Sequence, residues 1–360
     1  MERGSSSGVI LEVSGPQDSL KLYVNGEDSG SRTPSHLGLC RGDLVYAYWI
    51  LNGAWVVDGS ERFIRFRRDG HTIGYRLFVD VGGGEELVGY SLKRFISQYQ
   101  FDRLIGTEPI RVIDAAGCGE IFNVFRLADR GDLWALSLRG TRVFDISPIS
   151  GMRELRWLNL KETRVSSLSA LCELGELRWL SLTDTPVVDI LPLENLARLR
   201  VLSLYKTRVS DISSVAHLSE LRWFYLADTL VSDISPVSDL GGLVCLDIEG
   251  TGVVDISPIA HLKRLEQLNL KRTGISDISA VRNLTHLKEL ELSSTRVSDV
   301  RPLAGLKELE WLDLSNTGVR DLEPLEGLKN LKRLDLICTQ VPVSQIEWLK
   351  KKLPACKIRY

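Results

Sequence analysis

Hydrophobic positions recur at a fixed spacing through the last two thirds of the chain. From residue 133 to residue 342 the sequence repeats in units of 22 residues that read approximately LxxLxLxxTxVxDISPLxxLxx. Ten units follow one another without an insertion or deletion, and self-similarity of this kind predicts one supersecondary unit stacked many times. Threonine marks the same step of each unit at positions 141, 163, 185, 207, 229, 251, 273, 295, 317 and 339.

Within each unit, the LxLxx stretch predicts a short strand whose leucines point into a common core, because side chains alternate between the two faces of a strand. The steps Ser147-Pro148, Ser235-Pro236 and Ser257-Pro258 predict a serine N-cap followed by proline at the first helical position. Each unit should therefore turn from a strand into a short α- or 3₁₀-helical segment. The threonine hydroxyl is expected to bond the loop backbone of the neighbouring coil.

Both ends of the array are expected to carry caps, since the outermost coils would otherwise expose their apolar edges. Residues 109–132 are interpreted as a degenerate capping repeat whose strand, Val112–Ala115, is out of register by about one residue. Residues 343–360 predict an amphipathic helix, Val343–Lys352, which ends before Pro354, and then a short closing strand.

The segment from residue 133 to about residue 352 resembles the leucine-rich repeats of bacterial internalins and of the leucine-rich-repeat regulatory subunit of protein phosphatase one. It departs from many such families in placing threonine where they place asparagine. The resemblance implies an α/β leucine-rich-repeat solenoid with a parallel sheet on its concave face. It also implies that this face binds proteins.

Residues 1–108 show no repeat and predict an N-terminal all-β domain, a sandwich or a barrel. Turn signals at Asn25-Gly26, Asn52-Gly53 and Asp69-Gly70 separate the runs of strand-forming residues. The hairpin around Asp69-Gly70, from Phe63 to Val81, is the clearest, and a helix is expected near Ser91–Gln100. The predicted organisation is a β-rich domain at 1–108, a capping repeat at 109–132, the solenoid at 133–342 and the C-terminal cap at 343–360.

Composition narrows the possible functions. The 45 Lys and Arg residues nearly balance 47 Asp and Glu residues, for a formal net charge of -2, which disfavours a bulk nucleic-acid binder. No apolar run approaches the ~18 residues that a membrane span needs, and the first residues lack the apolar core of a signal peptide, so a cytoplasmic protein is expected. The six cysteines are scattered, and neither a metal site, a cofactor site nor a catalytic constellation is recognisable, so we expect no enzyme.

The residues between the strand leucines should face away from the core, and several are aromatic. Four of the eight tryptophans fall in one column of the repeats, and tyrosines occupy the next columns. Arginines precede the early strands and carboxylates follow in the later ones, which predicts a surface polarised from basic to acidic. The expected partner-binding residues are Trp157, Trp179, Trp223, Tyr205, Tyr225, Arg156, Arg178, Arg200, Arg222, Glu289, Glu291, Trp311 and Asp313.

These patterns predict a non-enzymatic interaction module, a scaffold or adaptor whose partner is a protein, and which could be one subunit of a larger complex. Two alternatives remain open. The repeats could be the targeting arm of an enzymatic or small-ligand-binding N-terminal domain. The arginine and tryptophan side chains could instead stack single-stranded nucleic acid, although the acidic later repeats disfavour that reading.

Overall fold

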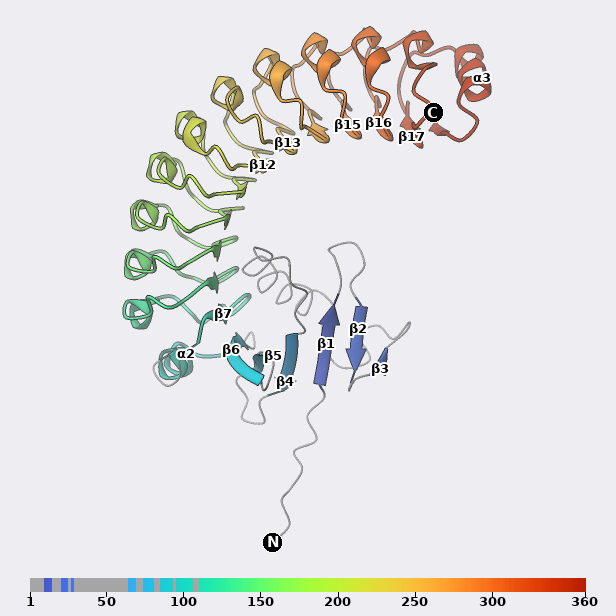
Figure 1. The fold of residues 1–360 in the computed structure, drawn as a ribbon. Coiled ribbons are helices and arrows are strands. Elements are labelled where there is room, and N and C mark those ends of the chain that lie inside the picture. Colours follow the sequence, from blue (N-terminus) through green and yellow to red (C-terminus); the bar gives the residue numbers. More distant parts are fainter. Residues whose placement is uncertain are drawn as a thin grey trace. The chain divides into compact units, whose positions relative to one another are not determined.

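A computed structural model describes residues 10–14, 21–24, 27–28, 64–68, 74–80, 85–92, 95–105 and 110–360. The chain divides into two compact units, Met1–Val165 and Ser166–Tyr360, here called unit 1 and unit 2. Each unit is described by itself. Figure 1 shows their elements along the chain.

Unit 1 begins with antiparallel strands. Strand β1 pairs with β2 and β4, β2 pairs with β3, and β4, β5 and β6 pair in sequence. The pairing of β4 with β5 confirms the hairpin predicted between residues 63 and 81. The predicted turn at Asn52-Gly53 and the boundary between residues 108 and 109 lie outside the described residues, so the sandwich or barrel stays a prediction. The strands are β1 (Ile10–Ser14), β2 (Lys21–Val24), β3 (Glu27–Asp28), β4 (Ile64–Arg68), β5 (Gly74–Asp80) and β6 (Glu85–Leu92).

The helix expected near residues 91–100 begins later than predicted. Ser91 still belongs to β6, and helix α2 spans Gln98–Ile105. A capping box sets this start: the Gln100 amide N–H donates to Ser97 Oγ at 3.3 Å, and the Ser97 amide N–H donates to Gln100 Oε1 at 3.0 Å. Strand β6 continues to Leu92 because β5 holds it on one edge in antiparallel register.

The first coils of the repeat follow in unit 1. Strands β7 (Val112–Asp114), β8 (Ala135–Ser137) and β9 (Trp157–Asn159) run parallel, and β6 pairs in parallel with β7. Ala135 lies opposite Trp157, 22 positions later, whereas Val112 lies opposite Ala135, 23 positions later. The predicted offset of one residue in the degenerate first repeat is therefore confirmed. The 3₁₀ segments are η2 (Phe125–Leu127) and η3 (Ser147–Ile149).

Unit 2 is a regular array in which every strand bonds the next in parallel. The strands line the inner edge of a curve and the 3₁₀ segments line its outer edge (Figure 1). The strands are β10 (Trp179–Ser181), β11 (Val201–Ser203), β12 (Trp223–Tyr225), β13 (Cys245–Asp247), β14 (Gln267–Asn269), β15 (Glu289–Glu291), β16 (Trp311–Asp313), β17 (Arg333–Asp335) and β18 (Lys357–Arg359).

Short helical segments return the chain from each strand to the next. They are 3₁₀ segments, one of the two predicted forms, and the C-terminal helix α3 has the predicted bounds, Val343–Lys352. The closing strand is also confirmed, because β18 pairs in parallel with β17. The 3₁₀ segments are η4 (Ser169–Leu171), η5 (Leu191–Leu193), η6 (Ser213–His217), η7 (Ser235–Val237), η8 (Ser257–His261), η9 (Ser279–Asn283), η10 (Arg301–Gly305) and η11 (Glu323–Leu325).

The core of unit 2 is a stack of aliphatic side chains. In the coil of β15, the side chains of Leu287, Leu290 and Leu292 are fully buried, as are those of Val297 and Leu303 in the return path. Burying one such side chain stabilises the fold by about 1.5–3 kcal/mol. Each coil therefore depends on its neighbours to cover its apolar edges, as the repeat predicted.

The threonine ladder is structural, but its bonds differ from the prediction. Thr207 Oγ1 donates to the Leu204 carbonyl oxygen at 2.7 Å, and Thr295 Oγ1 donates to the Leu292 carbonyl oxygen at 2.7 Å. Both partners lie three residues upstream in the same coil, so the expectation of a bond to the neighbouring coil is wrong. The buried hydroxyl satisfies a carbonyl at the end of its own strand, where the chain turns.

The predicted serine N-caps are also wrong. No side-chain cap bond is present at η7, and Ser235 is the first residue of that segment, not its cap. The aspartate two residues earlier does the capping: Asp233 Oδ1 accepts the Ser235 amide N–H at 2.8 Å, and Asp255 Oδ1 accepts that of Ser257 at 2.8 Å. The carboxylate can reach this amide because it forms a tight local turn with its own backbone.

A left-handed residue stands immediately before each ladder threonine. Gly140 and Gly250 fill this position with φ of 66°, but most coils place a residue with a Cβ there, such as Lys206 with φ of 57°. A left-handed conformation costs about 1–2 kcal/mol for residues other than glycine. The array therefore carries backbone strain at regular intervals, and packing between the coils compensates for it.

Cys338, with φ of 58° and an exposed side chain, offers a direct test of this strain. We expect Cys338→Gly to raise the free energy of unfolding by about 0.5–1 kcal/mol, because glycine relieves the conformation and loses part of the gain to its more flexible unfolded chain. Cys338→Ala is the control, since it removes the thiol and keeps the Cβ. Urea unfolding followed by circular dichroism measures both, and equal stability of the two variants would contradict the account.

Candidate partner-binding surface

In unit 1, the predicted surface residue Trp157 is not at the surface. Its side chain is only 2% exposed, so the expectation of a solvent-facing tryptophan there is wrong. Strand β9 places it opposite Ala135 of β8. Substituting Trp157 would therefore disturb packing, and the side chain is not retained in the surface proposed below.

The arginines of unit 1 do stack on an aromatic ring, but on a different one. The Arg111 guanidinium carbon lies 4.2 Å from the Trp134 ring centroid, and that of Arg156 lies 5.2 Å from it. The three residues precede consecutive strands, β7, β8 and β9, so the ring sits between two cations. Such contacts stabilise by about 0.5–2 kcal/mol each, which explains Arg156 as a residue that ties coils together.

The aromatic residues of unit 2 lie on the strand side at graded exposure. Trp223 is 36% exposed and is the most exposed tryptophan in the described part of the chain. Trp179, Tyr205, Tyr225 and Trp311 are half-buried. Strand β12 carries Trp223 and Tyr225 on the same face, because one residue separates them. The strand side of unit 2 thus carries aromatic side chains whose surface is not fully buried in the core.

Tyr225 packs beside Cys245 of the next strand. Burial is the main cause that raises the pKa of the Cys245 thiol to about 12, and burial also raises the pKa of the Tyr225 hydroxyl. A thiol acts as a nucleophile only in its thiolate form. At neutral pH this thiol is protonated, so the pair is not a nucleophilic centre.

Two arginines of the predicted basic half of unit 2, Arg200 and Arg222, already bond to residues in the loops of this unit. An Arg200 guanidinium nitrogen lies 3.0 Å from a Glu220 carboxylate oxygen, and Arg222 Nη1 donates to the Gly242 carbonyl oxygen at 3.1 Å. Arg178 is half-buried. The Arg333 guanidinium carbon lies 5.1 Å from the centroid of the Trp311 ring. The expected basic patch is therefore weaker than the sequence indicated.

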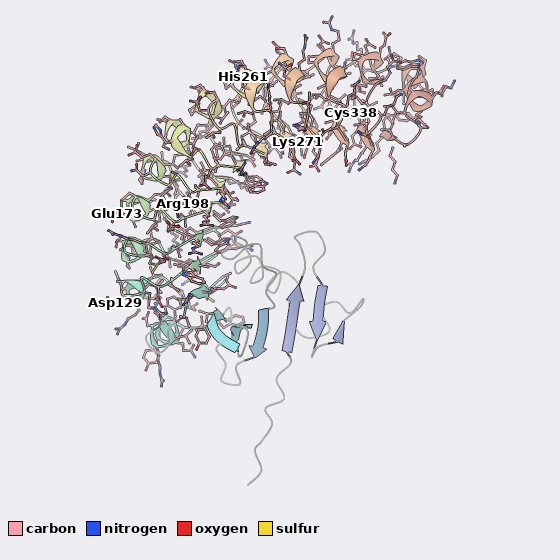
Figure 2. The ribbon with its side chains drawn as sticks, in the orientation of Figure 1. Asp129, Glu173, Arg198, His261, Lys271 and Cys338 are labelled. Carbon is pink, nitrogen blue, oxygen red and sulfur yellow. The ribbon has the colours of Figure 1, made fainter. Side chains whose placement is uncertain are left out.

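The acidic half is present and lies on the same face as the aromatic residues. Asp247, Glu289, Glu291 and Asp313 stand on consecutive or neighbouring strands from β13 to β16. Glu289 accepts a hydrogen bond from Gln267 Nε2 at 3.1 Å, and Asp247 accepts the Glu249 amide N–H at 3.0 Å. Figure 2 shows Lys271 on this strand side, away from His261 on the 3₁₀ side.

Burial shifts the titration of two of these carboxyl groups. It raises the pKa of Asp247, with the charges of Glu249 and Asp228 adding to the effect and the Glu249 amide opposing it. Burial likewise raises the pKa of Glu291; Lys271 opposes this, and nearby acidic residues add to it. Half-buried carboxylates of like charge thus repel one another on this face.

An arginine bridge beside this surface was not visible in the sequence. Arg272 Nη2 donates to Asp228 Oδ1 at 2.7 Å across the intervening coil, and Arg272 Nε donates to Glu249 at 3.0 Å. Gly250 makes room for it, because a Cβ there would lie 2.5 Å from Asp228 Oδ1. Gly250 was the sequence signal for this bridge, because most repeats place a larger residue immediately before the ladder threonine.

Unit 1 also exposes phenylalanines that sequence reasoning missed. Phe122 is 51% exposed, Phe125 64% and Phe144 63%. The signal was available, since Phe122 and Phe144 occupy the same loop position one repeat apart. Nothing in the structure shows what covers these rings, so they stay outside the proposed surface.

Among the residues that the structure describes, no cluster of three or more His, Cys, Asp or Glu side chains could hold a metal ion. Cys172, Cys245, Cys338 and Cys356 are free thiols. None of the described helices combines the length and the apolar character required to cross a bilayer.

The raised pKa of Glu291 gives a pH-dependent prediction. The folded chain holds this proton more tightly than the unfolded chain, so the charged form costs stability at neutral pH, and the cost shrinks as the pH falls through the folded pKa. We expect Glu291→Gln to raise the melting temperature at pH 7 and to lose this advantage below the ordinary pKa of 4.5. Thermal unfolding at pH 7 and at pH 4 measures the difference; a destabilised variant at pH 7 would contradict the assignment.

Comparisons with known proteins agree with this architecture. The family model described as Leucine Rich repeats (2 copies) matches residues 307–351. A solved internalin, inlF from Listeria monocytogenes, is 29% identical with a TM-score of 0.66, covering 72% of this chain and 75% of the internalin. A search of curated protein sequences gave no match.

Two more distant structures share the fold. A leucine-rich-repeat protein of Leptospira interrogans is 22% identical with a TM-score of 0.65, covering 76% of each chain. The plant peptide hormone receptor RGFR1, solved in complex with RGF2, is 15% identical with a TM-score of 0.59, covering 81% of this chain and 52% of the receptor. The 22-residue coils, their parallel strands and these similarities together identify the chain as a leucine-rich repeat protein that is similar in structure to bacterial internalins.

Proposed function

We propose that the protein is a non-enzymatic interaction module, a scaffold or adaptor, that binds a protein partner on the strand face of unit 2. The observation that carries this proposal is the 36% exposed Trp223 ring beside the half-buried Tyr225 and Tyr205, on a face that the core does not use. Tryptophan and tyrosine dominate binding hot spots because they bury a large area at little cost in conformational entropy.

A structure that shares the fold supports a binding role for the chain. RGFR1 is described as a receptor in complex with RGF2, so a leucine-rich-repeat chain of this fold can hold a ligand. Several adjacent coils of unit 2 can supply the ~800 Å² that a stable protein interface buries on one side. A peptide or a folded protein would both fit this description.

The sequence left two alternative functions open, an enzymatic N-terminal domain and binding of single-stranded nucleic acid, and no structural observation favours either of them. Single-stranded nucleic acid would require available cations beside the aromatic rings, but Arg200 and Arg222 are engaged with Glu220 and Gly242. The carboxylates of the later strands would repel phosphate. An enzymatic N-terminal domain, membership of a larger complex and a cytoplasmic location stay predictions.

Trp223→Ala tests the proposed surface. We expect it to weaken binding of the native partner about tenfold or more, the effect of losing a hot-spot side chain of more than about 1.4 kcal/mol. Leu230→Ala is the matched control, since Leu230 is 64% exposed but lies in a loop outside the strands. The partner is first isolated by affinity purification from the native source and then titrated against each variant.

The affinities can be compared only if both variants are folded. Circular dichroism should show both variants folded, because neither residue belongs to the aliphatic core. If Trp223→Ala binds the partner as tightly as the wild type, the strand face of unit 2 is not the binding surface.

A further inference from the structure

Several carboxylates on the strand side of unit 2 lack the ion pair that most charges around them have, and Lys271, the nearby cation, pairs with Glu249 instead. Around them, charges pair between neighbouring coils: Lys288 Nζ lies 2.8 Å from a Glu266 oxygen, and Lys332 Nζ lies 2.6 Å from a Glu310 oxygen. Four carboxylates form no ion pair with any described residue. We call them the acidic patch; its members are Asp247, Glu289, Glu291 and Asp313.

The fold does not require these charges. Asp247 Oδ1 accepts the Glu249 amide N–H at 3.0 Å, and one strand later Asn269 Oδ1 accepts the Lys271 amide N–H at 3.1 Å in the same register. The neutral amide thus makes the same turn as the carboxylate. Glu291, next in this column, makes no such bond among the described residues. Lys271 offsets part of its charge, but a half-buried carboxylate without an ion pair still costs stability. A role outside folding accounts for the charge.

A second, independent feature lies in the coil of Glu291. Ser293 is 5% exposed, and its hydroxyl has no hydrogen-bond partner within the described residues. It continues the alternation of Glu289 and Glu291, so its side chain lies on the strand side and not toward the leucine core. A buried hydroxyl without a partner is rare in folded proteins. A polar group of a bound ligand could supply the hydrogen-bond partner that the Ser293 hydroxyl lacks.

Aromatic rings stand at both ends of the acidic patch. Trp223 and Tyr225 lie on β12, and Trp311 lies on β16, where the Arg333 guanidinium carbon is already 5.1 Å from its centroid. Four strand steps separate β12 from β16, which is about 19 Å at about 4.8 Å per step. An extended peptide of about six residues spans that distance at about 3.3 Å per residue. Cations of such a peptide would meet both carboxylates and ring faces.

We infer that the strand face from β12 to β16 binds an extended peptide segment that carries lysine or arginine side chains. The acidic patch holds the cationic groups by charge-assisted hydrogen bonds, and Trp223 stacks on one of them at the β12 end. This inference rests on the proposed function and names the chemistry of the partner. Complementary charge fixes the orientation of the bound segment and speeds its association.

Direct titration with a defined peptide tests the charge requirement. The probe is a fluorescein-labelled (Lys-Ala)5 peptide, with (Gln-Ala)5 and (Glu-Ala)5 as controls, titrated with the full chain by fluorescence anisotropy. We expect binding of the lysine peptide alone, with an affinity that falls as salt is raised. Glu291→Gln combined with Asp313→Asn should weaken it about tenfold or more, because both side chains face the bound cations.

A matched variant separates this surface from general electrostatic attraction. Glu194→Gln combined with Asp239→Asn removes the same charge from exposed positions outside the strands. Its affinity for the lysine peptide should stay within about twofold of the wild type, since exposed charges contribute little at a distance beyond the Debye length. Equal loss in the two double variants, or no binding of the lysine peptide by the wild type, overturns the inference.

The native partner distinguishes failure of this inference from failure of the proposed function. If capture falls with Trp223→Ala and with Glu291→Gln/Asp313→Asn, both stand. If it falls with Trp223→Ala alone, the strand face binds a partner but not through cationic groups, and the inference fails by itself. If neither variant reduces capture, both fail.

Discussion

The constraint on which this structure depends is that no coil can bury its own leucines. Leu290 and Leu292 are fully buried only because strands on both sides keep the same register, Glu289 opposite Gln267 and opposite Trp311. A single inserted residue would turn apolar side chains outward from that point. The fixed unit of 22 residues is therefore a packing requirement, and it lays the surface side chains out in straight columns.

Residues at the same position of successive repeats can be compared directly, so a charged side chain among neutral ones is easy to interpret. Asn269 shows that a neutral side chain satisfies the turn after its strand, so the charge of Asp247 in the same column has no structural reason. The neighbouring charges follow a different rule, since Lys288 and Glu266 compensate each other across coils. The acidic patch thus costs folding stability, a common property of binding sites that a partner completes.

Much of this fold could be predicted from the sequence, because leucine spacing sets the strands and their register, and an amphipathic pattern before Pro354 sets the bounds of helix α3. The errors arose where local chemistry decides between equivalent options. Spacing cannot tell whether a threonine bonds its own coil, as Thr207 does, or whether Asp233 rather than Ser235 caps a segment. Spacing also does not show that Trp157 is buried, or that the Gly242 carbonyl oxygen engages Arg222. The columns of the candidate surface could therefore be predicted, but not the exposure of each side chain or its bonds within the fold, and its role in binding stays a prediction.

Footprinting of the complex tests the central claim most directly. Hydroxyl radicals oxidise exposed aromatic and aliphatic side chains, and mass spectrometry locates the products with and without the native partner. The account predicts that the partner protects Trp223 on the strand side, while the exposed Leu230 and Val254 in the loops react as before. Protection of Leu230 and Val254 with unchanged oxidation of Trp223 would contradict it.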